Sequence, residues 1–347
     1  MRKSKMPRKL LIWGGNGHPL SLENLNSHAS VSAFFLGREL ARDFEIISLT
    51  DMDKPEELLD HTNVDAMLSC FQYGFTSRII DKGKCKLFDD LRSRFRGPIC
   101  SIMDCVDLRR YCENVLFTVL PAPGLAFRTA LTALHLGHGP KTVRMGWSAA
   151  PDQCRPDGND NASLRIFVDH SCYTAGDMDL TGAFFKACQM ARKSIPDIPL
   201  HVRQQSNDGI IDWDLSGSFQ PEIHQRSHKV PWLKMMDEYS HSNIFFVTHR
   251  ESAGLAVIEA AMSGATIYVP DDGISFISPS LLGEGVPHRI IRCKTEKEAV
   301  ANLAEAILAD AKLAFRREEN HRKLAASNSW ECAAGRIRKT LASLGVD

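Results

Sequence analysis

The chain has 347 residues, of which 44% are hydrophobic and 24% are charged, a composition typical of a soluble globular protein. Its 42 basic side chains balance 42 acidic ones, so no global field would attract nucleic acid or an acidic membrane surface. No stretch of the sequence approaches the roughly 20 apolar residues that a membrane helix requires. The length suits two domains of roughly 150 residues each.

The ten cysteines include no Cys-x-x-Cys pair. Cys100, Cys105 and Cys112 are the nearest to a cluster, but their spacing is wide and unequal, and His-Glu-x-x-His is absent. The apolar run after the basic N-terminus, residues 10–13, is too short for the core of a signal peptide. We therefore expect reduced thiols, no metal site and a cytoplasmic location.

In the first half of the chain, short apolar stretches alternate with stretches of helical character. The expected strands are residues 9–15, 44–50, 63–70, 97–104 and 114–121, and the expected helices are residues 30–43, 88–96 and 126–137. Such alternation indicates a parallel sheet with helices on both faces.

The glycine-rich residues 13–18, WGGNGH, follow the first expected strand. They resemble a dinucleotide fingerprint, but Leu20 stands where the third Gly or Ala should be. We prefer a glycine turn that serves the fold, and rank a dehydrogenase low. His18 at the end of this turn either faces a cleft or is a surface histidine.

Residues 148–163 are rich in proline, glycine, aspartate and asparagine, which indicates an interdomain linker. A second alternating series follows, with expected strands at residues 164–170, 199–205, 243–248 and 265–270 and helices at residues 180–194, 230–242 and most of 295–345. Two doubly wound α/β domains are the simplest architecture, and ligands bind such sheets at the carboxyl ends of the strands.

Residues 249–270, HRESAGLAVIEAAMSGATIYVP, carry two glutamates, Glu251 and Glu259, on an expected helix between two strands. Both could be solvated helix glutamates, Glu251 near the positive helix end. However, the helix around Glu259 is small and apolar, so we expect Glu259 to be buried with a partner. Residues 252–255 would expose free backbone amides, a ready phosphate site, and Gly264 suits a left-handed helix cap.

The stretch ESAGLAVIEAAMSGATIYVP resembles the E-x7-E signature of retaining glycosyltransferases of the GT-B type, most of all family 4 (group 1). Three further segments agree in order and spacing: residues 141–156, 229–250 and 328–345, the last resembling a terminal Ser-Trp-Glu helix. In the N-terminal half, the resemblance rests only on WGGNGH and the strand and helix pattern.

The resemblance implies two Rossmann-like doubly wound domains that face a central cleft. Residues 1–148 would form the acceptor-side domain and residues 149–325 the domain that binds a nucleotide-sugar donor. The C-terminal helix, residues 326–347, would pack back on the first domain.

The resemblance also implies roles for single residues. Glu251 would contact hydroxyls of the donor sugar, and Glu259 would accept hydrogen bonds from the nucleotide ribose. The amides of Gly254 and Leu255 would hold the diphosphate, and backbone near Val230 would meet the base edge.

The N-terminal glycines and one aspartate complete this picture. Gly14 and Gly15 would let the first domain approach the phosphates closely. Asp104 falls where many relatives carry a His-Asp pair facing the acceptor, although Met103 replaces the histidine.

The sequence departs from the family at the residues that neutralise the diphosphate. Relatives carry an Arg and a Lys just after the first strand of the second domain, whereas residues 167–178 here place His170 near the arginine position and contain no lysine. Arg203, Arg250 and Lys229 are candidates to replace them. The candidate set is therefore catalytic Glu251, Asp104 and His170, and donor-binding Gly14, Gly15, Arg203, Val230, Ser252, Ala253, Gly254, Leu255 and Glu259.

The implied function is transfer of a hexose from a UDP- or GDP-sugar to an acceptor hydroxyl with retention, without a metal or further cofactor. The acceptor would be a saccharide, a lipid-linked molecule or a small molecule, with weak inner-membrane association in the lipid-linked case. DWD at residues 212–214 resembles the metal motif of another glycosyltransferase fold, but we expect a polar loop there. A sugar-nucleotide epimerase of the same fold and a catalytically weak or inactive nucleotide-sugar-binding protein are the alternatives.

Overall fold

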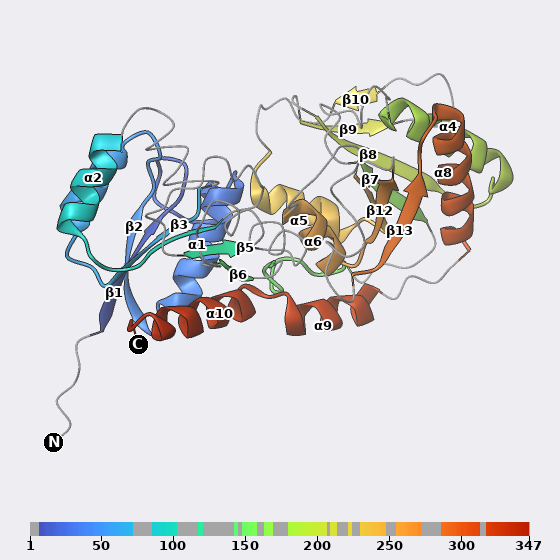
Figure 1. The fold of residues 1–347 in the computed structure, drawn as a ribbon. Helices are drawn as coiled ribbons and strands as arrows, with labels where there is room; N and C mark the ends of the chain where they lie inside the picture. The colour runs from blue at the N-terminus through green and yellow to red at the C-terminus, as the bar shows by residue number, and fades with distance from the viewer. Residues whose placement is uncertain are drawn as a thin grey trace. The chain divides into compact units, whose positions relative to one another are not determined.

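The computed structural model describes residues 7–71, 85–102, 117–120, 142–144, 148–157, 163–168, 180–206, 209–213, 221–223, 230–247, 255–271, 286–312 and 317–346. The chain divides into two compact units, Met1–Ser148 with Trp330–Asp347, and Ala149–Ser329 (Figure 1). Each unit is built on a sheet of mainly parallel strands with packed helices, which confirms the predicted α/β fold class.

The first unit contains a six-stranded sheet in the order β2-β1-β3-β4-β5-β6, in which all neighbouring strands are parallel. Its strands are β1 (Arg8–Trp13), β2 (Phe44–Leu49), β3 (Ala66–Ser69), β4 (Ile99–Ile102), β5 (Phe117–Leu120) and β6 (Thr142–Arg144). The central β1 is buried from Leu10 to Trp13, as a continuous apolar run predicts for a parallel strand covered on both faces.

The helices of the first unit are α1 (His28–Leu40), α2 (Cys85–Arg94) and α10 (Trp330–Ser343), with short 3-10 helices at Leu22–Asn24 and Pro55–His61. Ser27 caps α1, because its hydroxyl accepts from the Ser30 amide and the Ser30 hydroxyl accepts from the Ser27 amide. The C-terminal α10 packs on α1, where the rings of Phe35 and Trp330 stack with centroids 6.1 Å apart.

The second unit contains a seven-stranded sheet in the order β10-β9-β8-β7-β11-β12-β13. Its strands are β7 (Leu164–Val168), β8 (Leu200–Ser206), β9 (Gly209–Trp213), β10 (Pro221–Ile223), β11 (Ile244–Phe246), β12 (Thr266–Asp271) and β13 (His288–Arg292). Five neighbouring strands run parallel to one another: β8, β7, β11, β12 and β13. Strands β9 and β10 are antiparallel to their neighbours.

Helices cover both faces of this sheet because alternate strand residues point to opposite sides. The helices are α4 (Leu180–Ser194), α5 (Trp232–Ser240), α6 (Leu255–Met262), α8 (Glu296–Asp310) and α9 (Arg317–Ser327). On one face Phe246 stacks on Phe184 of α4, which lies beside α8 (Figure 1). On the other face Phe167 and Phe245 pack edge-on against Tyr239 of α5. The doubly wound arrangement follows from this alternation.

One of the two expectations about irregular segments was wrong. Asp212 and Trp213 of the DWD motif belong to strand β9 instead of a polar loop, because residues 211–213 pair with β10 and with β8. The predicted interdomain linker begins where the two units divide, at Ser148 and Ala149. Its described residues are anchored within the second unit, because Ala149 bridges to Ser329 and Cys154 is fully buried. Because the segment is mostly polar, its composition did not indicate that Ala149 and Cys154 would be buried.

Candidate functional site

The unit around the two glutamates forms as predicted. Strand β11, helix α6 and strand β12 follow one another, and β11 pairs with β12 in parallel. Helix α6 begins at Leu255, so its N-terminus follows the carboxyl end of β11. Gly264 adopts φ +97°, which confirms the predicted left-handed cap.

Several predicted site residues lie outside the described residues. These are Asp104, His170, Glu251, Ser252, Ala253 and Gly254. Their roles stay predictions. Leu255 is described, and its position at the start of α6 places its backbone amide among the N–H groups that lack a partner within the helix.

Glu259 is buried, with 4% of its surface exposed, so the solvated interpretation is wrong for this residue. Its Oε1 accepts a hydrogen bond from the indole Nε1 of Trp232 at 2.8 Å. Trp232 is the first residue of α5, two positions after Val230, which is itself buried. The bond therefore joins the segment expected near a base to the helix that carries the carboxylate.

A buried thiol lies close to this carboxylate. Burial, with a smaller contribution from the Glu259 charge, raises the pKa of Cys154 well above its usual range. Its Sγ lies 3.4 Å from Sδ of Met236 on α5. Cys154 is therefore a protonated packing residue near Glu259 and is not a nucleophile.

Arg203 is engaged within its own unit. It lies in β8, and its Nη1 donates to Oε2 of buried Glu238 on α5 at 2.6 Å. It lines a cavity together with Arg165 and His201, the second residues of β7 and β8. Sequence reasoning could not foresee this pairing, because the two residues are 35 positions apart.

Gly14 and Gly15 have a structural reason within the first unit. A Cβ at Gly14 would lie 2.7 Å from Cβ of Cys70, and one at Gly15 would lie 2.8 Å from Cβ of Thr50. The turn after β1 is therefore packed too closely against neighbouring chain for any larger residue. His18 is exposed on the surface of this unit.

Sequence reasoning missed a network of charges around Asp157. This buried carboxylate accepts from Nη1 of Arg317 at 2.7 Å and from Nη1 of Arg165 at 3.2 Å. Nδ1 of His241 lies 2.6 Å from it. Burial lowers the pKa of Arg317, although its bond to Asp157 opposes that shift. The aspartate lay in a stretch that composition marks as a linker, so no local signal pointed to it.

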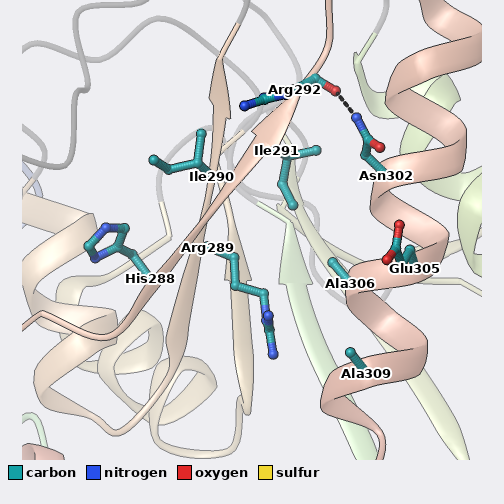
Figure 2. Close-up of a pocket in the computed structure, with 9 residues that line it drawn as sticks. All are labelled: His288, Arg289, Ile290, Ile291, Arg292, Asn302, Glu305, Ala306 and Ala309. Atoms are coloured by element: carbon teal, nitrogen blue, oxygen red, sulfur yellow. Dashed lines mark hydrogen bonds between the residues drawn. The ribbon is translucent and has the colours of Figure 1, made fainter.

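A second cavity of about 390 Å³ lies between β13 and α8 (Figure 2). The Asn302 amide donates to the carbonyl of Arg292 at 2.8 Å, and Ala306 and Ala309 line the side formed by α8. Arg289 is paired with buried Asp310, to which Tyr268 also donates at 2.6 Å. Its guanidinium charge is therefore compensated within the protein.

In the part of the chain that the structure describes, no three His, Cys, Asp or Glu side chains come together as a metal site. None of the described helices combines the length and apolarity that crossing a bilayer takes.

No family model matches the chain, and no curated protein matches it in sequence. Solved structures do match its fold. An α,α-trehalose 6-phosphate synthase from Burkholderia multivorans aligns with a TM-score of 0.59 over 98% of this chain and 97% of that chain, at 10% identity. A Listeria monocytogenes protein assigned as a UDP-N-acetylglucosamine 2-epimerase aligns with a TM-score of 0.53 over 97% and 96%, at 11% identity.

The pneumococcal O-GlcNAc transferase GtfA, solved with UDP and GlcNAc, aligns with a TM-score of 0.51 over 84% of this chain at 12% identity, and the chain spans 60% of its length. At such low identity, these similarities show the fold alone. The chain has the α/β fold of GT-B glycosyltransferases. Membership of family 4 stays a prediction.

Proposed function

We propose that this protein is a glycosyltransferase that takes a sugar from a nucleotide-sugar donor. The observation that carries the proposal is the fold match along nearly the whole chain to structures of glycosyltransferases, one of them solved with UDP. An epimerase of nucleotide-sugars shares the fold, so the fold supports a nucleotide-sugar ligand more directly than it supports sugar transfer.

In this proposal the second unit binds the donor at the carboxyl ends of β11 and β7. The amides at the start of α6, from Ser252 to Leu255, would hold the diphosphate, because helix N-terminal amides and the helix dipole both favour anions. Glu259 would accept hydrogen bonds from the ribose diol through its carboxylate. The indole bond would fix the orientation of the carboxylate.

The remaining assignments follow the resemblance. Backbone at Val230 would meet the base, Glu251 the sugar hydroxyls, and His170 the departing diphosphate. Asp104 would face the acceptor, and Gly14 and Gly15 would keep the donor-binding role that the resemblance gives them. We leave Arg203 out of the donor set, because it lines a cavity with residues from the amino ends of β7 and β8, whereas the donor would lie at the carboxyl ends.

Transfer would be driven largely by electrostatic stabilisation of the departing diphosphate and by alignment of an acceptor hydroxyl. We infer hexosyl transfer with retention, with backbone amides and cationic side chains in place of a metal ion. The acceptor would be a saccharide, a lipid-linked molecule or a small molecule. A lipid-linked acceptor would bring weak association with the inner membrane face, and the protein would act in the cytoplasm.

Donor turnover tests the proposal. Purified protein is incubated with UDP- and GDP-hexoses, with and without a mixture of saccharide acceptors, and the released nucleoside diphosphate and the sugar products are quantified. We expect release of one diphosphate that increases with acceptor and falls at least about a hundredfold in Glu251→Gln, if that residue stabilises charge in the transition state. The matched control is Glu296→Gln, an exposed glutamate in the first turn of α8.

Each alternative has its own outcome in this assay. A sugar epimer that remains attached to the nucleotide would identify an epimerase. Saturable nucleotide binding without any turnover would identify the inactive binding protein, which the missing lysine after β7 favours. The absence of both turnover and binding with every nucleotide-sugar tested would contradict the proposal.

A further inference from the structure

A cavity of about 330 Å³ lies at the amino ends of three parallel strands of the second unit. It is lined by Arg165, Ile166, His201, Arg203, Glu238, His241 and Ser242. Arg165 and His201 are the second residues of β7 and β8, and Ser242 precedes β11. Helix α6 follows the carboxyl end of β11, so this cavity lies toward the opposite edge of the sheet from the candidate donor site.

The cations of this cavity are exposed, whereas their carboxylate partners are buried. The side chains of Arg165 and Arg203 are 33% and 46% exposed, while those of Asp157 and Glu238 are 7% and 3% exposed. A ligand that enters the cavity would therefore meet guanidinium N–H groups before it meets carboxylate oxygens. The ion pairs with the buried carboxylates fix the orientation of the two guanidinium groups.

The charged groups around the cavity are paired with one another. Asp157 is shared by Arg165, His241 and the buried Arg317, and Glu238 pairs with Arg203. Glu318 adds a third carboxylate near Arg317, so the guanidinium charges of this network are balanced. An anion would therefore be held by the exposed N–H donors of Arg165 and Arg203 and not by an excess of positive charge. At the rim, Lys234 near Glu238 and Asp237 near His241 offset each other.

The negative end of α5 points toward this region, but its last carbonyls already have donors. The Ser240 hydroxyl donates to the backbone carbonyl of Asp237 at 2.7 Å. The Ser242 hydroxyl donates to the carbonyl of Glu238 at 2.8 Å, and the Ser242 amide donates to the carbonyl of Tyr239 at 3.0 Å. The carbonyl of Ser240 accepts from the Asp157 amide and from the Arg317 guanidinium. The carbonyls that would repel an anion are therefore engaged within the protein.

We propose that this cavity binds a phosphorylated small molecule, with Arg165 and Arg203 as its phosphate ligands and His201 and His241 at its sides. Guanidinium forks match phosphate oxygens in geometry and charge. The cavity volume lies in the range of small-molecule sites and exceeds what phosphate alone would fill, which indicates a ligand such as a sugar phosphate. The site is independent of the donor site proposed above.

Titration calorimetry at constant ionic strength tests the site with three probes: inorganic phosphate, glucose 6-phosphate and glucose. We expect saturable binding of both phosphates and none of glucose. Arg165→Gln and His201→Gln should weaken phosphate binding by roughly tenfold or more, because each replaces a group that can carry positive charge with a neutral amide. His201 is exposed, so His201→Gln should fold even if Arg165→Gln does not.

The matched control is Arg289→Gln on the same sheet. Like Arg165, Arg289 is a partly exposed guanidinium, 35% exposed, paired with a buried carboxylate, but it lines the other cavity (Figure 2). It should leave phosphate affinity unchanged, as should Glu259→Gln at the donor site. Absence of saturable binding in the wild type, an equal loss in Arg289→Gln, or unchanged affinity in a folded His201→Gln and Arg165→Gln would overturn the proposal. Loss of phosphate binding in Glu259→Gln would instead assign the phosphate to the donor site.

Discussion

At the scale of single residues, the informative side chains are those whose burial conflicts with their polarity. Glu259 and Asp157 are acids that the fold has buried, and each has a specific donor, Trp232 for the first and Arg317 for the second. Burying a charge is costly unless it is paired and hydrogen-bonded. These pairs therefore mark places where the sequence maintains a charge for a reason other than solubility.

The Trp232 bond can be tested by a substitution that removes only its donor. Trp232→Phe keeps an aromatic ring but leaves the buried Glu259 without the indole N–H. We expect the free energy of unfolding, measured with denaturant, to fall by about 1–3 kcal/mol, the usual effect of depriving a buried acceptor of its donor.

Trp330→Phe is the matched control. Trp330 is also buried, and its indole Nε1 has no hydrogen-bond partner among the described residues. The same change of ring should therefore cost less there. An equal loss in both variants would show that the ring, and not the bond, accounts for the effect.

Whether Glu259 would be buried could be judged from its small, apolar neighbours, but its partner could not. Trp232 lies 27 positions away on another helix, and helix-to-helix contacts of this kind depend on how α5 and α6 pack. The pairing of Arg203 with Glu238 escaped prediction for the same reason. The sequence indicates which residues need a partner, and only the packed structure indicates which partner they have.

At the scale of elements, apolar periodicity and glycine positions carried most of the prediction. The expected strands at residues 44–50 and 164–170 correspond to β2 and β7, and the expected helix at residues 180–194 is α4. Strand β13 was missed because HRIIR combines basic residues with only two apolar ones at the edge of the sheet. Edge strands need less burial, so their pattern is weaker.

Gly264 ends α6 and can be tested directly. It has φ +97°, and a Cβ there would lie 2.7 Å from Cβ of Arg317 on α9. Gly264→Ala should lower the free energy of unfolding by about 1–3 kcal/mol, because it adds both backbone strain and a close contact. Thermal or denaturant unfolding measures this.

Gly335 provides the opposite case. It lies inside α10, and a Cβ there would meet nothing within 4 Å. Gly335→Ala should therefore stabilise the protein by about 0.5–1 kcal/mol through helix propensity. Similar destabilisation of both variants would contradict this account of the two glycines.

At the scale of the whole molecule, the stability of both units depends on keeping buried thiols in their neutral form. Burial raises the pKa of Cys70 and Cys100 in the first unit, and of Cys154 and Cys188 in the second, above the ordinary value of a thiol. The folded state therefore keeps these protons at a pH where the unfolded state loses them. Each such thiol contributes stability that is fully present below its unfolded pKa and is lost as pH rises above it.

This predicts a loss of stability in mild base. An unfolded thiol has a pKa of about 8.5, so each buried thiol should cost about 1.4 kcal/mol of unfolding free energy between pH 7.5 and 9.5. Cys188→Ala should be less stable at pH 7.5 but should lose about that much less over the interval. Ile307→Ala, which removes buried apolar atoms but no thiol, is the control and should keep the pH dependence of the wild type. An identical pH dependence in all three proteins would refute the account.

The division into two α/β units, the parallel first sheet and the βαβ unit around Glu259 were all accessible from sequence, because each rests on local alternation of apolar strands and helices. The cavity at the amino ends of β7, β8 and β11 was not, since its lining comes from two strands, a helix and the turn after that helix, spread over nearly 80 residues. Function lies in such assembled sites, which is why the fold could be predicted more fully than the chemistry.

The central claim is that the second unit binds a nucleoside diphosphate at Glu259. The most direct measurement is titration calorimetry of the wild type with UDP, GDP, ADP and CDP, repeated with Glu259→Gln. We predict saturable binding of one diphosphate, weakened at least about tenfold in the variant, as expected for loss of charge-assisted hydrogen bonds to the ribose. Binding that is unchanged in a folded Glu259→Gln, or no binding of any nucleoside diphosphate by the wild type, would contradict the claim.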